Sequence, residues 1–212
     1  MGIFDFFKKK DVGKVITNSN KDINEDIGRE LTDDEKKELI KTLPTFEYNP
    51  NVYDNGIVEF KEGICECCGE KVSAYVSTMY AIERVKCICM NCVKDGSAAK
   101  KFDGDFIQHS QKISDPAKKE ILYHKTPGYI SWQGEYWLAC CDDYCEYIGD
   151  VGTKELDELG ITDDVINEYR ENISDSFDAD EIKDWLEAKG SFAGYLFKCK
   201  HCGKYHINID SD

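Results

Sequence analysis

The chain lacks any long hydrophobic run. Its first residues, from Met1 to Lys10, hold too short an apolar stretch for a secretory signal peptide, and no later segment approaches the length of a membrane-crossing helix. A secreted or membrane-embedded protein is therefore not expected. The sequence predicts a cytoplasmic protein with no membrane span.

The chain also lacks the short motifs of common enzyme classes. It has no glycine-rich phosphate loop, no H-E-x-x-H motif and no G-x-S-x-G motif. Its histidines have no catalytic motif around them, so each is expected to be a solvated or core side chain. They are His109, His124, His201 and His206. The sequence therefore predicts no catalytic residue and no organic cofactor.

Basic residues are scarce, because 27 Lys and Arg stand against 42 Asp and Glu, for a formal net charge of −15. The excess is concentrated in residues 142–188, which carry 17 acidic and 3 basic side chains, a net charge of −14. Such a surface repels nucleic acid and attracts basic proteins at low salt. A basic protein partner is one prediction, and a surface that only solubilises the protein is the other.

Cysteine, in contrast, is abundant, with 11 residues in a chain of 212. The odd number, the C-x-x-C spacing and the lack of a signal peptide favour reduced thiols and metal over a disulfide scaffold. A hydrophobic content of 41% lets the chain also bury a core, as one large domain or two small ones.

The first cysteine cluster contains two C-x-x-C pairs separated by 20 residues. This is a strong zinc signature, because tetrahedral Zn²⁺ takes four thiolates and each tight turn presents two. The predicted ligands are Cys65, Cys68, Cys89 and Cys92. Two further cysteines, Cys67 and Cys87, are left over. Four thiolates leave no open position for a substrate water, so this site is expected to be structural.

A third C-x-x-C pair, Cys199 and Cys202, has no neighbouring mate in the sequence. The candidate partners lie some sixty residues earlier, at Cys140, Cys141 and Cys145. If that stretch is helical, Cys141 and Cys145 share one face, whereas Cys140 and Cys141 point about 100° apart. The predicted ligands of a second zinc site are Cys141, Cys145, Cys199 and Cys202, with Cys140 as a substitute. The alternative is a core of free cysteines.

Caps and turns predict an α+β fold in which zinc stabilises β-hairpins around a helical acidic segment. Capping signals open helices at Thr32 and Ser114, which end near Lys41 and His124. Further helices are predicted over 153–159, 162–171 and 178–189, with Gly190 as a C-cap. Short strands are predicted over 46–48, 57–60 and 71–80, and a β-hairpin over 194–210. The aromatic stretch 129–147 is expected to be core, with a ligand-binding groove as the alternative.

These elements suggest a division of the chain. Residues 1–41 are predicted to be a flexible N-terminal extension that contains a short helix. Residues 42–212 are predicted to form a zinc-binding domain, with a first knuckle module at 60–104, a helical segment at 114–190 and a C-terminal knuckle hairpin at 194–210.

Several runs of residues carry a resemblance to one family. They include Leu43-Pro-Thr-Phe-Glu-Tyr48, Cys65-Glu-Cys-Cys-Gly69, Cys92-Val-Lys-Asp-Gly-Ser-Ala-Ala99, Thr126-Pro-Gly-Tyr129 and Gly194-Tyr-Leu-Phe-Lys-Cys-Lys-His-Cys-Gly203. From about Leu43 to Asp210 the sequence resembles the CbrC-like family of bacterial proteins, which is associated by name with tolerance to a nuclease colicin. Cys140-Cys141 stands where that family tends to have His-Cys, and a zinc site tolerates this exchange, which favours a ligand at this position.

The resemblance and the charge together favour a binding protein of the CbrC-like type, which protects a bacterium by engaging a basic toxin or regulator through the acidic residues 142–188. A zinc-dependent enzyme that uses the second site is the alternative. A zinc-ribbon protein that binds nucleic acid is the third hypothesis, because the two knuckle regions are only weakly basic.

Overall fold

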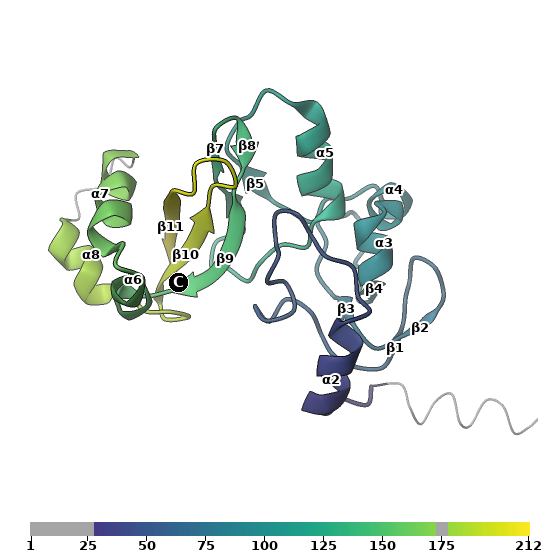
Figure 1. Cartoon of the computed structure of the whole chain (residues 1–212). Helices are drawn as coiled ribbons and strands as arrows, with labels where there is room; N and C mark the ends of the chain where they lie inside the picture. Colours follow the sequence, from purple (N-terminus) through teal and green to yellow (C-terminus); the bar gives the residue numbers. More distant parts are fainter. Residues whose placement is uncertain (1–27, 173–177) are drawn as a thin grey trace, which may run out of the picture.

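The computed structural model describes residues 28–172 and 178–212, which combine helices with small, mostly antiparallel sheets (Figure 1). The helices are α2 (Asp33–Ile40), α3 (Met90–Lys94), α4 (Ser97–Phe102), α5 (Pro116–Lys125), α6 (Thr153–Leu159), α7 (Thr162–Asn172) and α8 (Ala179–Trp185). The strands are β1 (Gly63–Ile64), β2 (Lys71–Val72), β3 (Tyr75–Val76), β4 (Ile88–Cys89), β5 (His109–Ser110), β6 (Tyr136–Trp137), β7 (Ala139–Cys140), β8 (Asp143–Tyr144), β9 (Glu146–Val151), β10 (Phe192–Lys198) and β11 (Tyr205–Ser211). The predicted α+β class is confirmed.

Helix α2 begins at the predicted capping box. The Thr32 backbone N–H donates to the Glu35 carboxylate at 2.8 Å, and the Thr32 hydroxyl accepts from the Glu35 backbone N–H. Before this helix, residues 28–31 pair with residues 60–62, for example through Leu31 N–H and Phe60 C=O at 3.1 Å. Residues 1–27 of the predicted extension lie outside the described residues, but residues 28–31 are bonded to the body of the protein.

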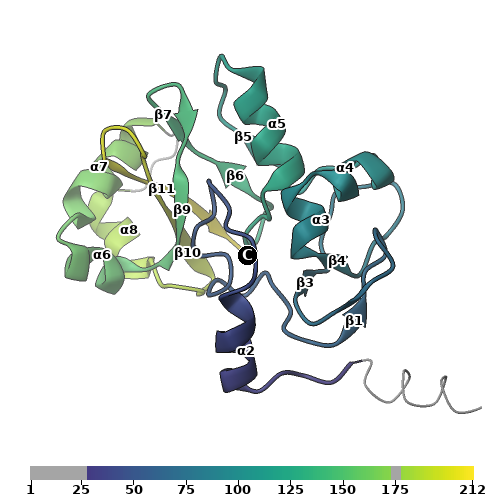
Figure 2. The ribbon, with the colours of Figure 1, turned by 45° about the vertical axis from the view of Figure 1, so that its right-hand side comes forward.

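The first half of the chain packs around one hydrophobic cluster, in which the β1–β2 and β3–β4 hairpins meet helices α3 and α4 (Figure 2). Among its fully buried side chains are Ile88, Val93 and Ala98. Each hairpin strand has only two residues, so the hairpins bury little surface of their own. Hairpins this short depend on contacts with the rest of the module for their stability.

The second half is organised by the three-stranded antiparallel sheet β11–β10–β9. Side chains of β10 alternate between its faces, because successive residues of a strand point to opposite sides. Leu196 joins Ile207 and the helices α6–α8 in one cluster, whereas Tyr195 and Phe197 join an aromatic cluster on the other face. Figure 1 shows α6, α7 and α8 together on one side of this sheet.

The aromatic cluster lies between the sheet and the loops that cross its other face. Tyr129 stacks on Tyr147 with ring centroids 4.5 Å apart, and Trp137 packs edge-on against Phe197 at 5.6 Å. All four side chains are buried. The predicted core role of the aromatic stretch therefore holds for Tyr129, Trp137 and Tyr147, but Trp132 and Tyr136 remain exposed at 53% and 41%.

Several predicted elements differ in the structure. Residues 46–48 and 57–60 form no strand, although Phe46 and Tyr48 are buried, and residues 71–80 contain two dipeptide strands instead of one long strand. The predicted helical segment 114–190 contains strands β6–β9 between its helices. Helix α8 ends at Trp185, so Gly190 is not its cap. The aromatic and β-branched residues of 136–151 favour strands. Their burial overrides the four-residue spacing of Cys141 and Cys145 that would suit a helix.

Candidate metal centres

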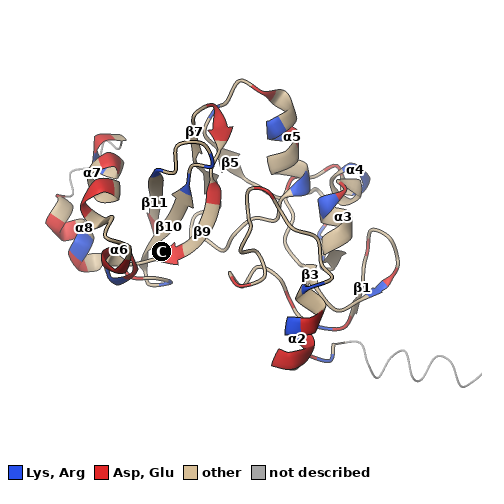
Figure 3. Ribbon diagram, in the orientation of Figure 1, with Lys and Arg blue, Asp and Glu red and all other residues tan. Residues whose placement is uncertain are grey.

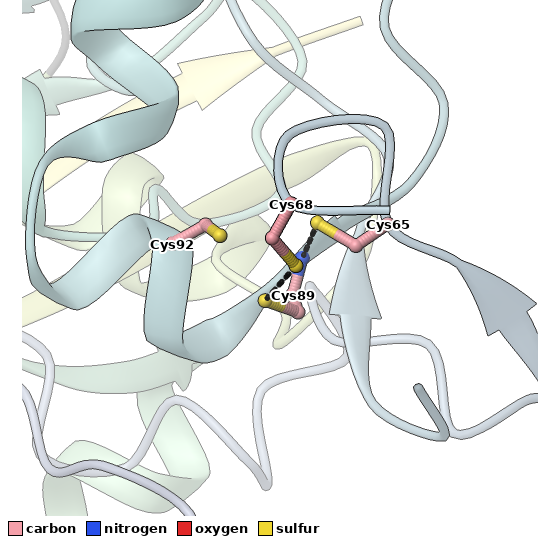
Figure 4. A group of neighbouring side chains, drawn as sticks. All are labelled: Cys65, Cys68, Cys89 and Cys92. Carbon is pink, nitrogen blue, oxygen red and sulfur yellow. Dashed lines mark hydrogen bonds between the residues drawn. The ribbon is translucent and has the colours of Figure 1, made fainter. Parts of the chain in front are cut away.

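The first cysteine tetrad joins a tight turn to the beginning of a helix (Figure 4). Cys65 and Cys68 lie in the turn between β1 and β2, Cys89 ends β4, and Cys92 lies in helix α3. The four sulfur atoms lie within 4.8 Å of one another. These are the four residues that the sequence predicted, and the structure brings all of them together.

The sulfur separations fit a bound metal ion and do not fit disulfides. The Cys68 and Cys89 sulfur atoms are 3.9 Å apart, whereas a disulfide bond is about 2.05 Å long. In a tetrahedral site with metal–sulfur bonds of about 2.3 Å, two sulfur atoms are about 3.8 Å apart. All described cysteines are free. The tetrad can therefore hold a metal ion.

The second tetrad has the same spacing but comes from two hairpins. Cys199 and Cys202 lie in the turn between β10 and β11, and Cys140 and Cys141 lie at the tip of the β7–β8 hairpin. The Cys140 sulfur is 3.7 Å from the Cys202 sulfur and 3.7 Å from the Cys141 sulfur. All four sulfur atoms again lie within 4.8 Å of one another.

This ligand set differs from the predicted one at Cys145, because residues 139–144 form a hairpin and not a helix. The two central residues of its turn, Cys141 and Asp142, have φ angles of 55° and 56°, as a two-residue hairpin loop requires. The reversal of the chain at Cys141 brings its sulfur beside that of Cys140. Cys145 is instead fully buried in the aromatic cluster, where its backbone C=O accepts from the Trp137 indole N–H at 2.9 Å.

The turns of the two tetrads share one hydrogen-bond pattern. In the first, Gly69 N–H donates to Cys65 C=O at 2.8 Å, and in the second, Gly203 N–H donates to Cys199 C=O at 3.0 Å. Both glycines have the positive φ angles, 81° and 74°, that favour glycine. The Cys202 backbone N–H also donates to the Cys199 sulfur at 3.4 Å. Both turns therefore present their two sulfur atoms in the same way.

Backbone donors lower the pKa of the first cysteine of each turn. Burial raises the pKa of Cys65, but hydrogen bonds from the backbone N–H groups of Cys89, Cys68 and Cys67 outweigh it and bring the pKa to about 7. The same balance, with donors at Cys202 and His201, lowers the pKa of Cys199 to about 6. Burial raises the pKa of Cys89 to about 11. Thiols this close ionise together only when a cation offsets their repulsion.

Asp143 ties together the two turns of the second tetrad, and no sequence motif indicated it. Its buried carboxylate is 2.8 Å from His201 Nε2 and 3.2 Å from Lys200 Nζ, both in the Cys199–Cys202 turn. It also accepts from the Tyr48 hydroxyl at 3.0 Å. Since Asp143 itself follows Cys141 by two residues, it links one ligand-bearing turn to the other.

The remaining predicted residues lie outside the tetrads. Cys67 contacts Ser97 Oγ at 3.6 Å, and burial raises the pKa of Cys87 to about 12. His124 lies between the carboxylates of Asp105 and Glu120 on the surface. His206 is half-buried, and its Nδ1 is 2.7 Å from the Glu168 carboxylate.

The acidic residues gather on helices α6–α8 (Figure 3). The exposed acids of this unit are Asp157, Glu158, Asp163, Asp164, Glu171, Asp178, Asp180, Glu181, Asp184 and Glu187. Between α7 and the beginning of β11 lies a groove of about 730 Å³, whose lining includes Asp164, Glu168 and Glu171. Leu159 and Trp185 are also exposed on these helices, at 50% and 52%.

The fold and these sites define a mixed α and β protein with two cysteine tetrads that can each hold a metal ion. A sequence profile described as "Uncharacterised protein family (UPF0167)" matches residues 43–211, and the chain belongs to this family. It is 32% identical to the UPF0167 protein PA1536 of Pseudomonas aeruginosa over 175 residues, which cover 79% of this chain and 97% of that protein.

The chain is also 32% identical to the UPF0167 protein Mb2317 of Mycobacterium bovis over 177 residues, which cover 79% of this chain and 93% of that protein. No solved structure matches the chain. Among the described residues, no helix has both the length and the apolar character needed to cross a membrane.

Proposed function

We propose that each tetrad binds one Zn²⁺ and that the two ions stabilise a protein that binds other proteins. Sulfur separations of 3.7–3.9 Å support tetrahedral zinc. Each set already supplies four thiolates, and a catalytic zinc site keeps one position open for water or substrate. The arrangement therefore favours structural ions over the alternative of a zinc enzyme.

The partner that we propose is a basic protein that binds to the acidic helices α6–α8. The groove lined by Asp164, Glu168 and Glu171 is the observation that carries this proposal, because three carboxylates outnumber the one cation of the lining, Lys204, and favour Lys and Arg side chains. The exposed Trp185 beside this charge supports a protein partner, since aromatic side chains supply much of the binding energy of interfaces.

The resemblance to the CbrC-like family extends the proposal to a role in toxin tolerance. A nuclease toxin needs a basic surface to bind nucleic acid, so an acidic protein would compete for that surface. A regulator with a similarly basic surface would bind to the same acidic helices. In this proposal the chain itself does not bind nucleic acid.

Charge reversal tests the acidic surface. The triple variant Asp164→Lys, Glu171→Lys and Asp184→Lys changes exposed acids of α7 and α8. Glu168 is left unchanged because it pairs with His206, and Asp163 because its carboxylate is 2.7 Å from Lys183 Nζ. The matched control reverses the exposed acids Asp54, Glu70 and Glu83, which lie outside these helices.

A fluorescent Lys- and Arg-rich peptide serves as the probe, with binding measured by anisotropy over a range of salt concentrations. We expect the wild-type protein and the control to bind at low salt and the α7–α8 variant to lose at least about tenfold in affinity. Equal binding by the two variants would refute the proposal for this surface. A single-stranded oligonucleotide of the same length should not bind.

A further inference from the structure

A cavity of about 290 Å³ lies on the aromatic side of the sheet, away from both cysteine tetrads and from the acidic groove. The side chains that define it are Asn55, Ile130, Trp132, Asp150, Lys189 and Tyr195. Its size is close to the lower end for small-molecule sites. Ile130 and Trp132 at its walls are 58% and 53% exposed, although both are large and apolar. Such exposure in a hollow is typical of a binding site.

Hydrogen bonds hold the aromatic walls in place. The Trp132 indole N–H donates to Gly190 C=O at 2.9 Å, and its backbone N–H donates to the Tyr195 hydroxyl at 3.3 Å. The Tyr195 hydroxyl in turn donates to Asp210 at 2.7 Å. Trp132 is exposed, but hydrogen bonds from its backbone N–H and its indole N–H hold it in position without burial. The cavity is therefore preorganised.

One acid, Asp150, lies in this mostly apolar lining. Its side chain is only 10% exposed, and one of its carboxylate oxygens accepts from the Tyr147 hydroxyl at 2.7 Å. Burial raises the pKa of Asp150, although the Tyr147 hydrogen bond and the charge of Lys189 lower it. A carboxylate with so little water around it is stabilised by a cation that enters the cavity.

Lys189 is a weak partner for this carboxylate. Its Nζ is 4.0 Å from the second Asp150 oxygen, beyond hydrogen-bond distance, and its side chain is 71% exposed. Lys189 also has a φ angle of 62°, which is uncommon for a residue with a side chain. The ammonium group can therefore move into solvent when another cation takes its place.

We propose that this cavity binds a small molecule with a planar apolar body and a positively charged amine. The amine donates to the free oxygen of Asp150, and the planar body lies against the exposed ring of Trp132, which also attracts a cation. Because neither cysteine tetrad takes part, this inference does not depend on the proposed zinc or partner binding.

Benzylammonium is the probe, with phenylacetate and benzyl alcohol as an anion and a neutral molecule of similar shape. Binding is followed by NMR at the indole N–H of Trp132, while the buried Trp137 indole reports on the overall structure. We expect benzylammonium to shift the Trp132 resonance and to bind at least about fivefold more tightly than either analogue.

Two variants and one control test the roles of the charges. Asp150→Asn should weaken benzylammonium binding at least about fivefold, because the amide keeps the Tyr147 bond but loses the charge. Lys189→Ala should strengthen it about twofold or more, since the competing cation is gone. Asp163→Asn is the control. It removes an acid that pairs with Lys183 outside the cavity, and it should leave benzylammonium affinity unchanged.

Three results would overturn the proposal: an unmoved Trp132 resonance with benzylammonium, equal binding of phenylacetate, or unchanged affinity in Asp150→Asn. If Asp150→Asn alters the Trp137 resonance and so fails to fold, Lys189→Ala decides the question. Weaker or equal benzylammonium binding by that variant would then reject the role of Asp150.

Discussion

At the scale of single residues, the second tetrad shows how one backbone conformation selects a metal ligand. Cys140 and Cys141 would diverge on a helix, but the left-handed conformation of Cys141 and Asp142 brings both sulfur atoms toward Cys199 and Cys202. Residues other than glycine adopt this conformation at a cost. A bound ion would offset that cost through two additional metal–sulfur bonds.

The paired variants Cys140→Ser and Cys145→Ser test this assignment. Cys140→Ser should lose about one bound zinc per chain and melt at a lower temperature, because a hydroxyl is a poor replacement for a thiolate ligand. Cys145→Ser should keep its zinc and lose only about 1–3 kcal/mol of stability from the buried hydroxyl. Metal analysis and thermal unfolding distinguish the two, and loss of zinc in Cys145→Ser alone would contradict the structure.

Glu135 provides a residue-scale test of stability against pH. It is buried, accepts from the Tyr80 hydroxyl at 2.5 Å and has a pKa raised above its ordinary value of 4.5, chiefly by burial. Its folded pKa therefore exceeds its unfolded pKa, so the folded state binds more protons. Its contribution to stability is largest below the unfolded pKa and falls as the pH rises through the folded pKa.

We expect Glu135→Gln to abolish the loss of stability that ionisation of Glu135 causes at higher pH, while the amide oxygen of Gln still accepts from the Tyr80 hydroxyl. Urea unfolding of both proteins between about pH 4 and about pH 7 measures the difference, in which the contributions of other carboxylates cancel. The free energy of unfolding of the variant, relative to the wild type, should become more favourable as the pH rises. A constant difference would show that Glu135 is not perturbed.

At the scale of elements, each tetrad includes the turn of a hairpin with two-residue strands, β1–β2 in the first tetrad and β7–β8 in the second. Hairpins of two-residue strands are marginal alone, so the connections that hold the turns together matter more than the strands. In the second tetrad the connection is Asp143, which contacts the opposite turn through Lys200 and His201.

Asp143→Asn should therefore weaken zinc binding at the second tetrad by about 10–100-fold, the usual effect of losing a group that orients metal ligands. Competition with a chromophoric chelator measures the affinity. Asp142→Asn is the matched control, because the Asp142 side chain is exposed and accepts from Ser114 instead of contacting the opposite turn, Cys199–Cys202. Equal affinities of the two variants would argue against the bridging role.

The segment that contains α2 allows a second test at this scale. Residues 28–31 pair with residues 60–62, and Leu39 and Leu43 pack against the first hydrophobic cluster. Chains that lack residues 1–27 and residues 1–41 should therefore differ in melting temperature by several degrees, with the shorter chain less stable. Thermal unfolding followed by circular dichroism measures the difference, and equal melting temperatures would show that residues 28–41 contribute no stability.

At the scale of the whole molecule, the two tetrads differ in their access to solvent. In the first tetrad only Cys68 is exposed, whereas in the second both Cys141 and Cys202 are exposed. The ions should consequently be lost at different rates. Under the proposed function, an ion in the first tetrad would connect the β1–β2 turn to β4 and α3, and an ion in the second would connect the β7–β8 and β10–β11 hairpins.

We expect protein purified without added metal to contain about two zinc ions per chain and to release them to a chelator in two phases. The fast phase should be absent from Cys202→Ser and the slow phase from Cys65→Ser. Elemental analysis and a zinc-sensitive dye measure both quantities. A single phase, or a melting temperature that is unchanged after complete chelation, would contradict the structural role of the ions.

Much of this protein was predictable from short stretches of sequence. The two C-x-x-C-G turns, the capping box at Thr32 and the helices near 116, 153 and 162 depend on residues a few positions apart, whose chemistry acts locally. The first cysteine set was also predictable, because both of its pairs carry the same spacing signal. The net charge of −14 over residues 142–188 required only counting.

Only the tertiary structure decided the rest. Cys140 and Cys141 meet Cys199 and Cys202 some sixty residues later because two hairpins pack against each other, and Asp143 acquires its partners in the same way. The cavity at Asp150 likewise forms between segments from residue 55 to residue 195. Sequence spacing determines which side chains a turn presents, whereas long-range packing determines what they face.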